Sequence, residues 1–304
     1  MRSQTCRNYR RDRRPKKKID ITIRIASSGA RKIVVNGHRT IKQNELVGTS
    51  PTVFVLPEDI ALTSEASSFH RQFLDLYISQ YSHRYLDDLI SYRKILLQRN
   101  KLLKDILKSA GKISQLDAWD QLLVEHGTRI IADRLSFTRS IADPAEEYYS
   151  RFDSSSQFSL AYKPKIEQDQ EDIETAMKIQ LENYRDREFR AGLTLVGPHR
   201  DRLAMNLNGK SVRHYGSRGQ KRCVMLAMKL AVADLLSEVK QEQVTLILDE
   251  VFAELDSVKS QALMDVLSGY GQVFMATAGE FDFGDIPIRR VHVENGKTSD
   301  GSTA

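Results

Sequence analysis

Two adjacent carboxylates, Asp249 and Glu250, follow a short apolar run at residues 244–248 (VTLIL). A continuous apolar run is typical of a buried parallel strand, and the ligands of α/β sheets bind at the carboxyl ends of such strands. In a nucleotide hydrolase, Asp249 would hold Mg²⁺ and Glu250 would orient or deprotonate the attacking water. A core strand followed by an acidic turn explains the same residues without catalysis.

A Gly-Ser-x-Gly-Gln segment at residues 216–220 opens an expected helix over about residues 217–239. The N-terminus of a helix suits phosphate oxygens, because its first backbone N–H groups have no partner within the helix. The hydroxyl of Ser217 can donate a hydrogen bond to phosphate, and Gly219 permits close backbone approach. An ordinary helix with a serine cap is the alternative interpretation.

The elements that would position these groups alternate between helix and strand. The helix at 217–239 is followed by the strand at 244–248, a helix at about 257–268 and a strand at 273–276. This order indicates a parallel α/β sheet. Further strands are expected at residues 193–196, 203–207 and 290–293, with a hairpin signal at Asn208-Gly209.

The first two thirds of the chain are β-rich and then helical. Alternating isoleucines at 19–25 predict a half-buried strand, Asn36-Gly37 predicts a hairpin, and a strand is expected at 52–56. One helix is expected to begin at Ser67 or Ser68, and a second to run from Ser82 to Gly111. A third begins at about residue 117 and is interrupted or ended by Pro144, and a fourth covers about 171–190. The expected division is a basic tail at 1–18, a β-rich part at 19–62, a helical lobe at 63–191 and an α/β part at 192–304; under the family resemblance described below, 19–62 is the remnant of a β-rich ATPase lobe and 192–304 is the ATPase lobe with the signature motif, Walker B motif and D-loop.

The order of the chemical segments is that of the signature motif, Walker B motif and D-loop of ABC-type ATPases. Several segments resemble the RecF family more closely. They are residues 53–60 (VFVLPEDI), 71–75 (RQFLD), 92–100 (YRKILLQRN), 197–201 (GPHRD), 215–220 (YGSRGQ), 248–251 (LDEV) and 254–256 (ELD). The resemblance covers roughly residues 19–280.

The resemblance implies an α/β fold, an ABC-type (SMC-like) ATPase head with a helical second lobe. In such heads two subunits sandwich two ATP molecules, so ATP and Mg²⁺ are the implied cofactors. Asp249 would hold Mg²⁺, and Glu250 would be the catalytic residue that activates water. The implied contacts across the dimer are Ser217, Gly219 and Gln220 toward the γ-phosphate of the opposite subunit, and Asp256 at the dimer seam.

The resemblance also implies a function in DNA replication and recombinational repair, within the SOS response. Single-stranded or gapped DNA would be bound in an ATP-dependent manner. The implied partners are a second copy of the chain, in an ATP-dependent homodimer, and the recombination mediator proteins of the RecFOR pathway, which loads recombinase at single-strand gaps. ATP would hold the dimer together, and loss of the γ-phosphate would release DNA.

One motif of the family, the P-loop Gly-x-x-x-x-Gly-Lys-Ser/Thr, does not occur in the sequence. Residues 279–284 have the glycine spacing, but Asp285-Ile286 follow them. Residues 295–298 contain Gly-Lys-Thr, but Val291 stands where the first glycine belongs. Because the family carries its P-loop near the N-terminus, we expect a chain truncated at its start.

This departure supports an alternative function, that of a truncated, ATPase-inactive DNA-binding or adaptor protein. For this chain we expect feeble ATP binding and no turnover attributable to Glu250. A second departure is Arg202, which occupies a position where the family commonly has an acidic residue. Beside it, His199 and Arg200 could contact phosphate or a dimer partner, or serve as structural hydrogen-bonding groups.

The formal net charge of +6, from 46 Lys and Arg against 40 Asp and Glu in 304 residues, is unevenly distributed. Residues 1–18 alone have a net charge of +8, and residues 185–222 have a net charge of +7. The tail could contact DNA phosphates, and 185–222 is the candidate within the body, so the DNA-contacting residues stay open. No apolar run is long enough to span a membrane, and two cysteines, Cys6 and Cys223, indicate a reduced, cytoplasmic protein.

Overall fold

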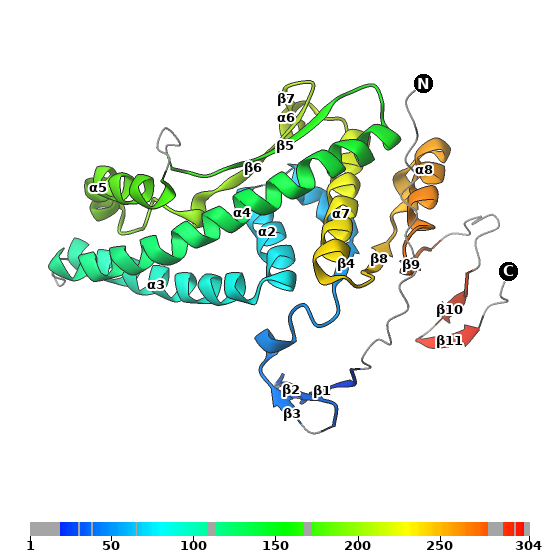
Figure 1. Ribbon diagram of the computed structural model, residues 1–304, viewed down its shortest axis with the longest axis horizontal. Coiled ribbons are helices and arrows are strands. Elements are labelled where there is room, and N and C mark those ends of the chain that lie inside the picture. The colour runs from blue at the N-terminus through cyan, green and yellow to red at the C-terminus, as the bar shows by residue number, and fades with distance from the viewer. Residues whose placement is uncertain are drawn as a thin grey trace. The chain divides into compact units, whose positions relative to one another are not determined.

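The computed structural model (Figure 1) describes residues 19–29, 31–37, 39–64, 66–108, 113–166, 172–278, 288–294 and 296–300. The predicted basic tail at 1–18 and the predicted helix end at Gly111 lie outside these residues. The chain divides into two compact units, Met1–Val47 and Gly48–Ala304. The lobe boundaries predicted near residues 63 and 191 stay predictions. Within the described residues, no helix is both long and apolar enough to cross a membrane.

The first unit contains an antiparallel sheet of β1 (Ile21–Ile25), β2 (Arg31–Val35) and β3 (Arg39–Ile41), followed by η1 (Gln43–Leu46). The predicted hairpin at Asn36-Gly37 is confirmed, because both residues have positive φ angles (52° and 72°), as the tight turns of hairpins require. The strand predicted at 19–25 is found as β1, but the prediction that it is half-buried is wrong, since Ile23 and Ile25 are 49% and 68% exposed.

The second unit contains the parallel sheet that the sequence predicts. It consists of β4 (Thr52–Val55), β8 (Thr245–Asp249) and β9 (Gln272–Ala276), in the order β4-β8-β9. One face of the sheet is buried, and it carries Val53, Val55, Leu246 and Leu248. The adjoining helices are α7 (Arg218–Lys240) and α8 (Ser257–Leu267).

The opposite face of this sheet carries an apolar row that is only partly covered. Phe54, Ile247 and Phe274 lie side by side in the strand register, and Phe274 is 54% exposed. The apolar run at 244–248 is typical of a strand buried on both faces. In the described structure, Ile247 is only half-buried, so burial on both faces is not found.

Helices make up the middle of the chain. After η2 (Pro57–Ile60) come α1 (Ala61–Ser64), α2 (Ser67–Tyr81), α3 (His83–Leu107), η3 (Ile113–Gln115), α4 (Leu116–Phe152) and α5 (Ile173–Ala191). The helix predicted after Ser82 is found as α3, and Ser82 caps it by accepting a hydrogen bond from the Tyr85 amide at 3.1 Å. A cap of α2 by Ser67 or Ser68 is not found, because the N-cap is Ala66.

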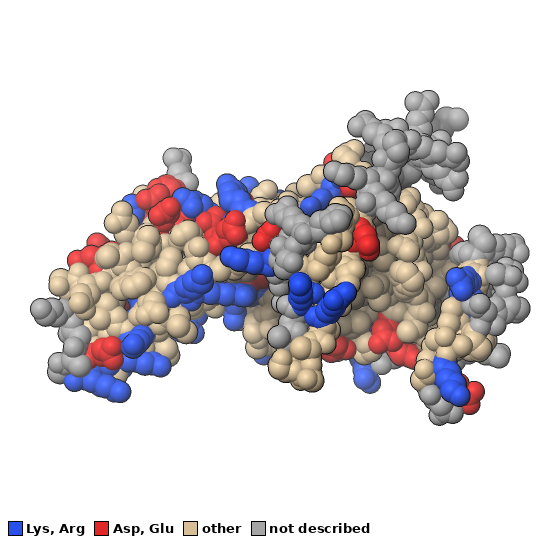
Figure 2. All heavy atoms as spheres, turned by 90° about the horizontal axis from the view of Figure 1, so that it is seen from below, with Lys and Arg blue, Asp and Glu red and all other residues tan. Residues whose placement is uncertain are grey.

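One side of α3 is basic, with exposed Arg93, Lys94, Lys101 and Lys104. Figure 2 views this side, and Lys and Arg gather along it.

The helix α4 continues through Pro144, so the prediction that Pro144 interrupts or ends it is wrong. A proline within a helix removes one backbone hydrogen bond. Packing offsets that loss here, because Ile141, Ala145 and Tyr149 are fully buried on either side of the proline. Tertiary contacts therefore override the local signal.

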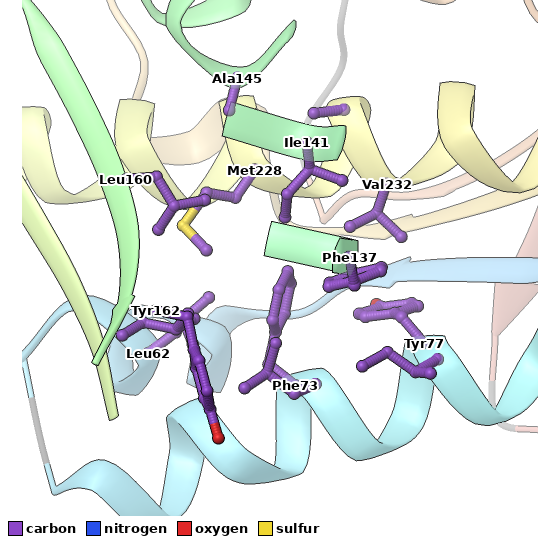
Figure 3. Close-up of a cluster of buried hydrophobic side chains, with 14 of the residues drawn as sticks. Leu62, Phe73, Tyr77, Phe137, Ile141, Ala145, Leu160, Tyr162, Met228 and Val232 are labelled. Carbon is purple, nitrogen blue, oxygen red and sulfur yellow. The ribbon is translucent and has the colours of Figure 1, made fainter. Parts of the chain in front are cut away.

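The core lies where α2, α4, α7 and β5 (Phe158–Lys163) meet. Figure 3 shows Phe73 and Tyr77 of α2, Phe137 and Ile141 of α4, and Met228 and Val232 of α7 pointing toward one another. Residues 223–233 of α7 are buried without interruption, so α7 is the central helix of this core.

A second, antiparallel sheet has the order β5-β6-β7, with β6 at Arg202–Leu207 and β7 at Lys210–Ser211. The hairpin predicted at Asn208-Gly209 is confirmed, with φ angles of 48° and 77°.

The strand expected at 193–196 is absent, because side chains accept the hydrogen bonds of its backbone amides. The Thr194 amide donates to Asn100 Oδ1 at 2.7 Å, and the Leu195 amide donates to Glu188 Oε1 at 2.7 Å. The remaining elements are α6 (Val212–Tyr215), η4 (Pro198–Arg200), η5 (Phe252–Glu254) and a hairpin of β10 (Val291–Glu294) and β11 (Lys297–Asp300).

Candidate functional site

The N-terminus of α7 carries the signature segment. Ser217 is the N-cap, and its Oγ accepts a hydrogen bond from the Gln220 amide at 3.2 Å. In return, Gln220 Oε1 accepts from the Ser217 amide at 3.0 Å, which completes a capping box. Ser217 and Gly219 are exposed. The hydroxyl proton of Ser217 is not used by the cap, so Ser217 can still donate it to an anion in front of the helix.

Gly219 lies in the first turn of α7, and the fold does not require a glycine there. A Cβ placed on Gly219 would meet no heavy atom within 4 Å, and its φ angle is not in the left-handed region. Gly216 is different, because a Cβ there would lie 2.7 Å from the carbonyl oxygen of Val212. A glycine that packing does not explain, at an exposed helix N-terminus, is suited to close approach of a ligand.

The two carboxylates Asp249 and Glu250 lie at the carboxyl end of β8, as predicted. Both are half-buried. Glu250 adopts a positive φ angle of 49°, which is uncommon for a residue other than glycine. Two contacts with the end of β9 hold it there: its amide donates to the Ala276 carbonyl at 3.0 Å, and its Oε1 accepts from the Ala278 amide at 2.7 Å. Strain of this kind is concentrated at functional sites.

Asp256 is the N-cap of α8. Its Oδ1 accepts from the Lys259 amide at 2.9 Å, and the Lys259 ammonium group binds its other oxygen. The hydrogen bonds from Lys259 hold the pKa of Asp256 below its usual value. The side chain is 54% exposed, so Asp256 remains accessible to a partner.

The second turn of α7, which follows the signature segment, lies near the N-terminus of α8. Burial raises the pKa of the Cys223 thiol, in the second turn of α7, to about 11, and the charges of Lys259 and Asp256 also act on this thiol. In contrast, no hydrogen bond or ion pair between described residues joins Ser217, Gly219 or Gln220 to Asp249 or Glu250. Direct contacts between described residues therefore do not join these two groups within one chain.

A pocket of about 200 Å³ lies beside the signature segment. Gly216, Gln220, Lys210 and Tyr215 line it, together with the turn between β6 and β7. Tyr215 is 73% exposed. Sequence reasoning missed Lys210, whose only signal was its place after the Asn208-Gly209 hairpin.

Within the loop at 197–201, Gly197 and His199 have structural roles. The Tyr92 hydroxyl donates to His199 Nδ1 at 2.7 Å, and His199 Nε2 donates to the Thr194 carbonyl at 3.1 Å. Burial lowers the pKa of His199 to about 4, so the ring is neutral at physiological pH. Gly197 has a φ angle of 122°, and a Cβ there would lie 2.4 Å from the Tyr92 hydroxyl. Of the two roles considered for His199, the structural one is found.

Residues from distant family-specific segments converge on this loop. Arg134 is buried, and it donates to the Pro198 carbonyl and to Asp75 Oδ1, both at 2.7 Å. Arg71 donates to the Asp201 carbonyl at 3.1 Å. Arg99 is also buried, and it binds Thr194 Oγ1 at 2.9 Å. The segments at 71–75 and 92–100 therefore belong to one hydrogen-bond network with 197–201, which the sequence did not reveal.

Comparison with curated proteins finds relatives with one shared name. The chain is 35% identical over 274 residues to the DNA replication and repair protein RecF of Moorella thermoacetica, covering 90% of this chain and 71% of that protein. It is 38% identical over 251 residues to the RecF protein of Chloroherpeton thalassium, covering 80% and 68%. A comparison with protein-family models found no match.

Solved structures agree. The recombination mediator protein RecF-ATP in the RecFOR pathway matches with a TM-score of 0.83 and 28% identity, covering 93% of this chain and 76% of that one. The Smc head domain of Pyrococcus yayanosii matches with a TM-score of 0.50 and 12% identity, covering 93% and 78%, and this likeness concerns the fold alone. The expected α/β, ABC-type (SMC-like) head is thus confirmed. On the identity and coverage of its curated relatives, the chain belongs to the RecF family of DNA replication and repair proteins.

Proposed function

We propose that this chain acts in DNA replication and recombinational repair, in the cytoplasm, by binding single-stranded or gapped DNA in an ATP-dependent manner. It would help the mediator proteins of the RecFOR pathway to load recombinase during the SOS response. The observation that carries the proposal is the exposed N-terminus of α7, where Gly219 leaves open space that the fold does not need. A relative of known structure, RecF-ATP, supports it.

The described residues could form two halves of a nucleotide site. One half would lie at the N-terminus of α7 and the other at the carboxyl end of β8. Ser217, Gly219 and Gln220 would bind the γ-phosphate of a nucleotide held by a second copy, and Asp256 would lie at the seam between the copies. Asp249 would hold Mg²⁺, which supplies charge neutralisation for phosphate when bound. Glu250 would orient the attacking water and accept its proton, with its carboxylate positioned by the Ala278 amide at 2.7 Å.

The two groups of residues could complete each other in a symmetric dimer. In a two-fold arrangement, the α7 N-terminus of one copy would face the carboxyl end of β8 in the other, and the reverse contact would be identical. A ligand that binds the dimer and not the monomer stabilises the dimer by mass action, and its loss reverses the association. The dimer would therefore form with ATP and dissociate after hydrolysis.

A second candidate function is that of an ATPase-inactive DNA-binding or adaptor protein. One observation favours it: residues 1–304 contain no P-loop pattern. For this chain, turnover attributable to Glu250 is then not expected, and DNA would be bound equally well with and without ATP.

The deciding experiment measures the affinity of the chain for single-stranded DNA with and without ATP and Mg²⁺. The first function predicts an ATP-dependent gain in affinity that Ser217→Arg abolishes, because the larger side chain blocks the α7 N-terminus. The control is Ser136→Arg, which adds the same charge at an exposed position of α4. ATP-independent DNA binding, unchanged in both variants, would establish the second function instead.

A further inference from the structure

Positive side chains from four separate parts of the chain surround the loop at 197–201. We name them the basic patch, and its members are Arg71 of α2, Lys163 and Lys165 at the end of β5, Arg200 and Arg202 on either side of Asp201, and Arg213 of α6. All are exposed except Arg71, which is half-buried. Only three of the six fall within the segment at 185–222 that the sequence singled out.

Direct contacts bring the members of the basic patch together. Lys163 lies opposite Arg202 in the β5–β6 register. The Lys165 amide donates to Asp201 Oδ1 at 2.6 Å, and Arg71 donates to the Asp201 carbonyl at 3.1 Å. His70 adds a further marker, since the charges of Arg71, Arg213 and Arg202 all act on its ring.

Two carboxylates among the described residues near the basic patch, those of Asp201 and Asp75, are held by other partners. Asp201 is 1% exposed, and its carboxylate accepts hydrogen bonds from the Tyr162 hydroxyl and the Lys165 amide. Asp75 is occupied by Arg134, Tyr85 and Arg93. Among the described residues, no carboxylate lies within ion-pair distance of Lys163, Lys165, Arg202 or Arg213.

This arrangement places like charges near one another at a cost. Like charges directly opposite on neighbouring strands destabilise a sheet, and Lys163 and Arg202 form such a pair. Burial lowers the pKa of the Arg71 guanidinium, as do the charges of Arg134 and Arg200, against the opposing charges of Asp201 and Asp75. A bound polyanion would relieve this repulsion, and arginine forks match the geometry of phosphate oxygens.

We propose that the basic patch binds the phosphodiester backbone of DNA. This inference rests on the proposed DNA-binding function and gives that function a place on the surface. Contacts to phosphates carry no sequence information, so binding here would be independent of base sequence and strongly dependent on salt. The site lies within Gly48–Ala304 and is separate from the predicted tail contact at 1–18.

The test compares the full chain with the triple variant Lys163→Gln, Arg202→Gln, Arg213→Gln. None of these side chains makes a hydrogen bond or ion pair within the described structure, so the variant is expected to fold. Affinity for a fluorescent single-stranded oligonucleotide is measured by anisotropy over a series of salt concentrations. The matched control removes three positive charges elsewhere, by Arg84→Gln, Arg139→Gln and Arg151→Gln, all at exposed positions of α3 and α4.

The triple variant should lose at least about tenfold in affinity for DNA. The slope of log affinity against log salt is negative, and its magnitude should decrease by about 2, because each of the three lost contacts to a single strand contributes about 0.7. If the triple variant and the control lost DNA affinity equally, the basic patch would not be the binding site, but the proposed DNA-binding function of the chain would still stand. Absence of DNA binding by the unaltered chain would instead contradict the proposed function itself. The proposal would also be overturned if the triple variant lost affinity for an acidic protein but kept its affinity for DNA.

Crosslinking gives a readout that does not depend on variants. DNA carrying a photoreactive phosphate analogue should crosslink to peptides that contain residues 163–165 and 200–213 in the unaltered chain. Crosslinks confined to residues 1–18 would place the contact in the tail and overturn the proposal.

Discussion

His70, which is buried, and His199, which is half-buried, show how single residues of the head are held neutral. His199 accepts from Tyr92 and donates to Thr194, and His70 donates to the Leu62 carbonyl at 3.0 Å and accepts from the Leu203 amide at 3.2 Å. Each ring thus uses one nitrogen as a donor and the other as an acceptor. Protonation would remove the acceptor, and for this reason neither ring suits acid–base chemistry near neutral pH.

These histidines predict a loss of stability in mild acid. Burial lowers the pKa of both His70 and His199 from about 6.5 to about 4, so the unfolded chain binds protons that the folded chain does not. The free energy of unfolding should therefore fall as pH decreases from about 6.5 toward about 4, by up to roughly 3 kcal/mol per histidine. Urea unfolding at several pH values measures this fall. The variant His70→Gln, His199→Gln should show a shallower pH dependence, and an identical profile would refute the assignment.

At the scale of elements, the N-terminus of α7 separates stability from function. Ser217 stabilises the helix through its capping box with Gln220. Gly219 contributes no packing that a larger residue would disturb, since a Cβ there meets no atom within 4 Å. A residue that weakens its own helix is expected where a ligand must approach the backbone.

Two substitutions at this helix should move stability in opposite directions. Ser217→Ala removes the cap and should lower the free energy of unfolding by about 1 kcal/mol. Gly219→Ala improves helix propensity and should raise it by up to about 1 kcal/mol. Under the proposed function, both variants should lose the ATP-dependent gain in DNA affinity. Urea unfolding and DNA titrations measure the two effects, and a destabilised Gly219→Ala protein would show that packing requires the glycine.

The elements also show which local signals are reliable. Both Asn-Gly hairpins, the helix beginning at Ser82 and the strand before Asp249 were predicted correctly, because their signals lie within a few residues of chain. The prediction that Pro144 interrupts or ends α4 was wrong, because burial of the neighbouring side chains outweighs the loss of one backbone hydrogen bond. Residues 193–196 read as a strand, but Asn100 and Glu188 bind their amides instead of a neighbouring strand.

For the whole molecule, the core belongs to the second unit. The main buried cluster begins at Val53 and joins α2, α4, α7 and the two sheets that contain β5 and β8. In Met1–Val47, Ile33 is the one buried hydrophobic side chain among the described residues. The stability of Gly48–Ala304 should therefore not depend on the first unit.

A chain of residues 48–304 should unfold cooperatively at nearly the same temperature as the full chain. Because the cluster remains complete, the midpoint should change by less than about 4 °C, which corresponds to roughly 1 kcal/mol at this size. Circular dichroism melts of both chains measure it. Leu246→Ala in the shortened chain is the control, since it opens a cavity in the same core and should lower the midpoint clearly. A non-cooperative melt of 48–304 would contradict the division.

The family, the order of the chemical segments and the local elements that carry Ser217, Asp249 and Asp256 could all be predicted from the amino-acid sequence. These features depend on residue type and short spacing, which the sequence states directly. Which distant segments meet depends on the packing of the whole chain. Packing turns Asp201 inward beside the basic patch, joins Arg71 to the loop at 197–201 and joins Arg99 to Thr194 next to that loop. Contacts between residues far apart in the chain have no period or spacing, and for this reason packing alone reveals them.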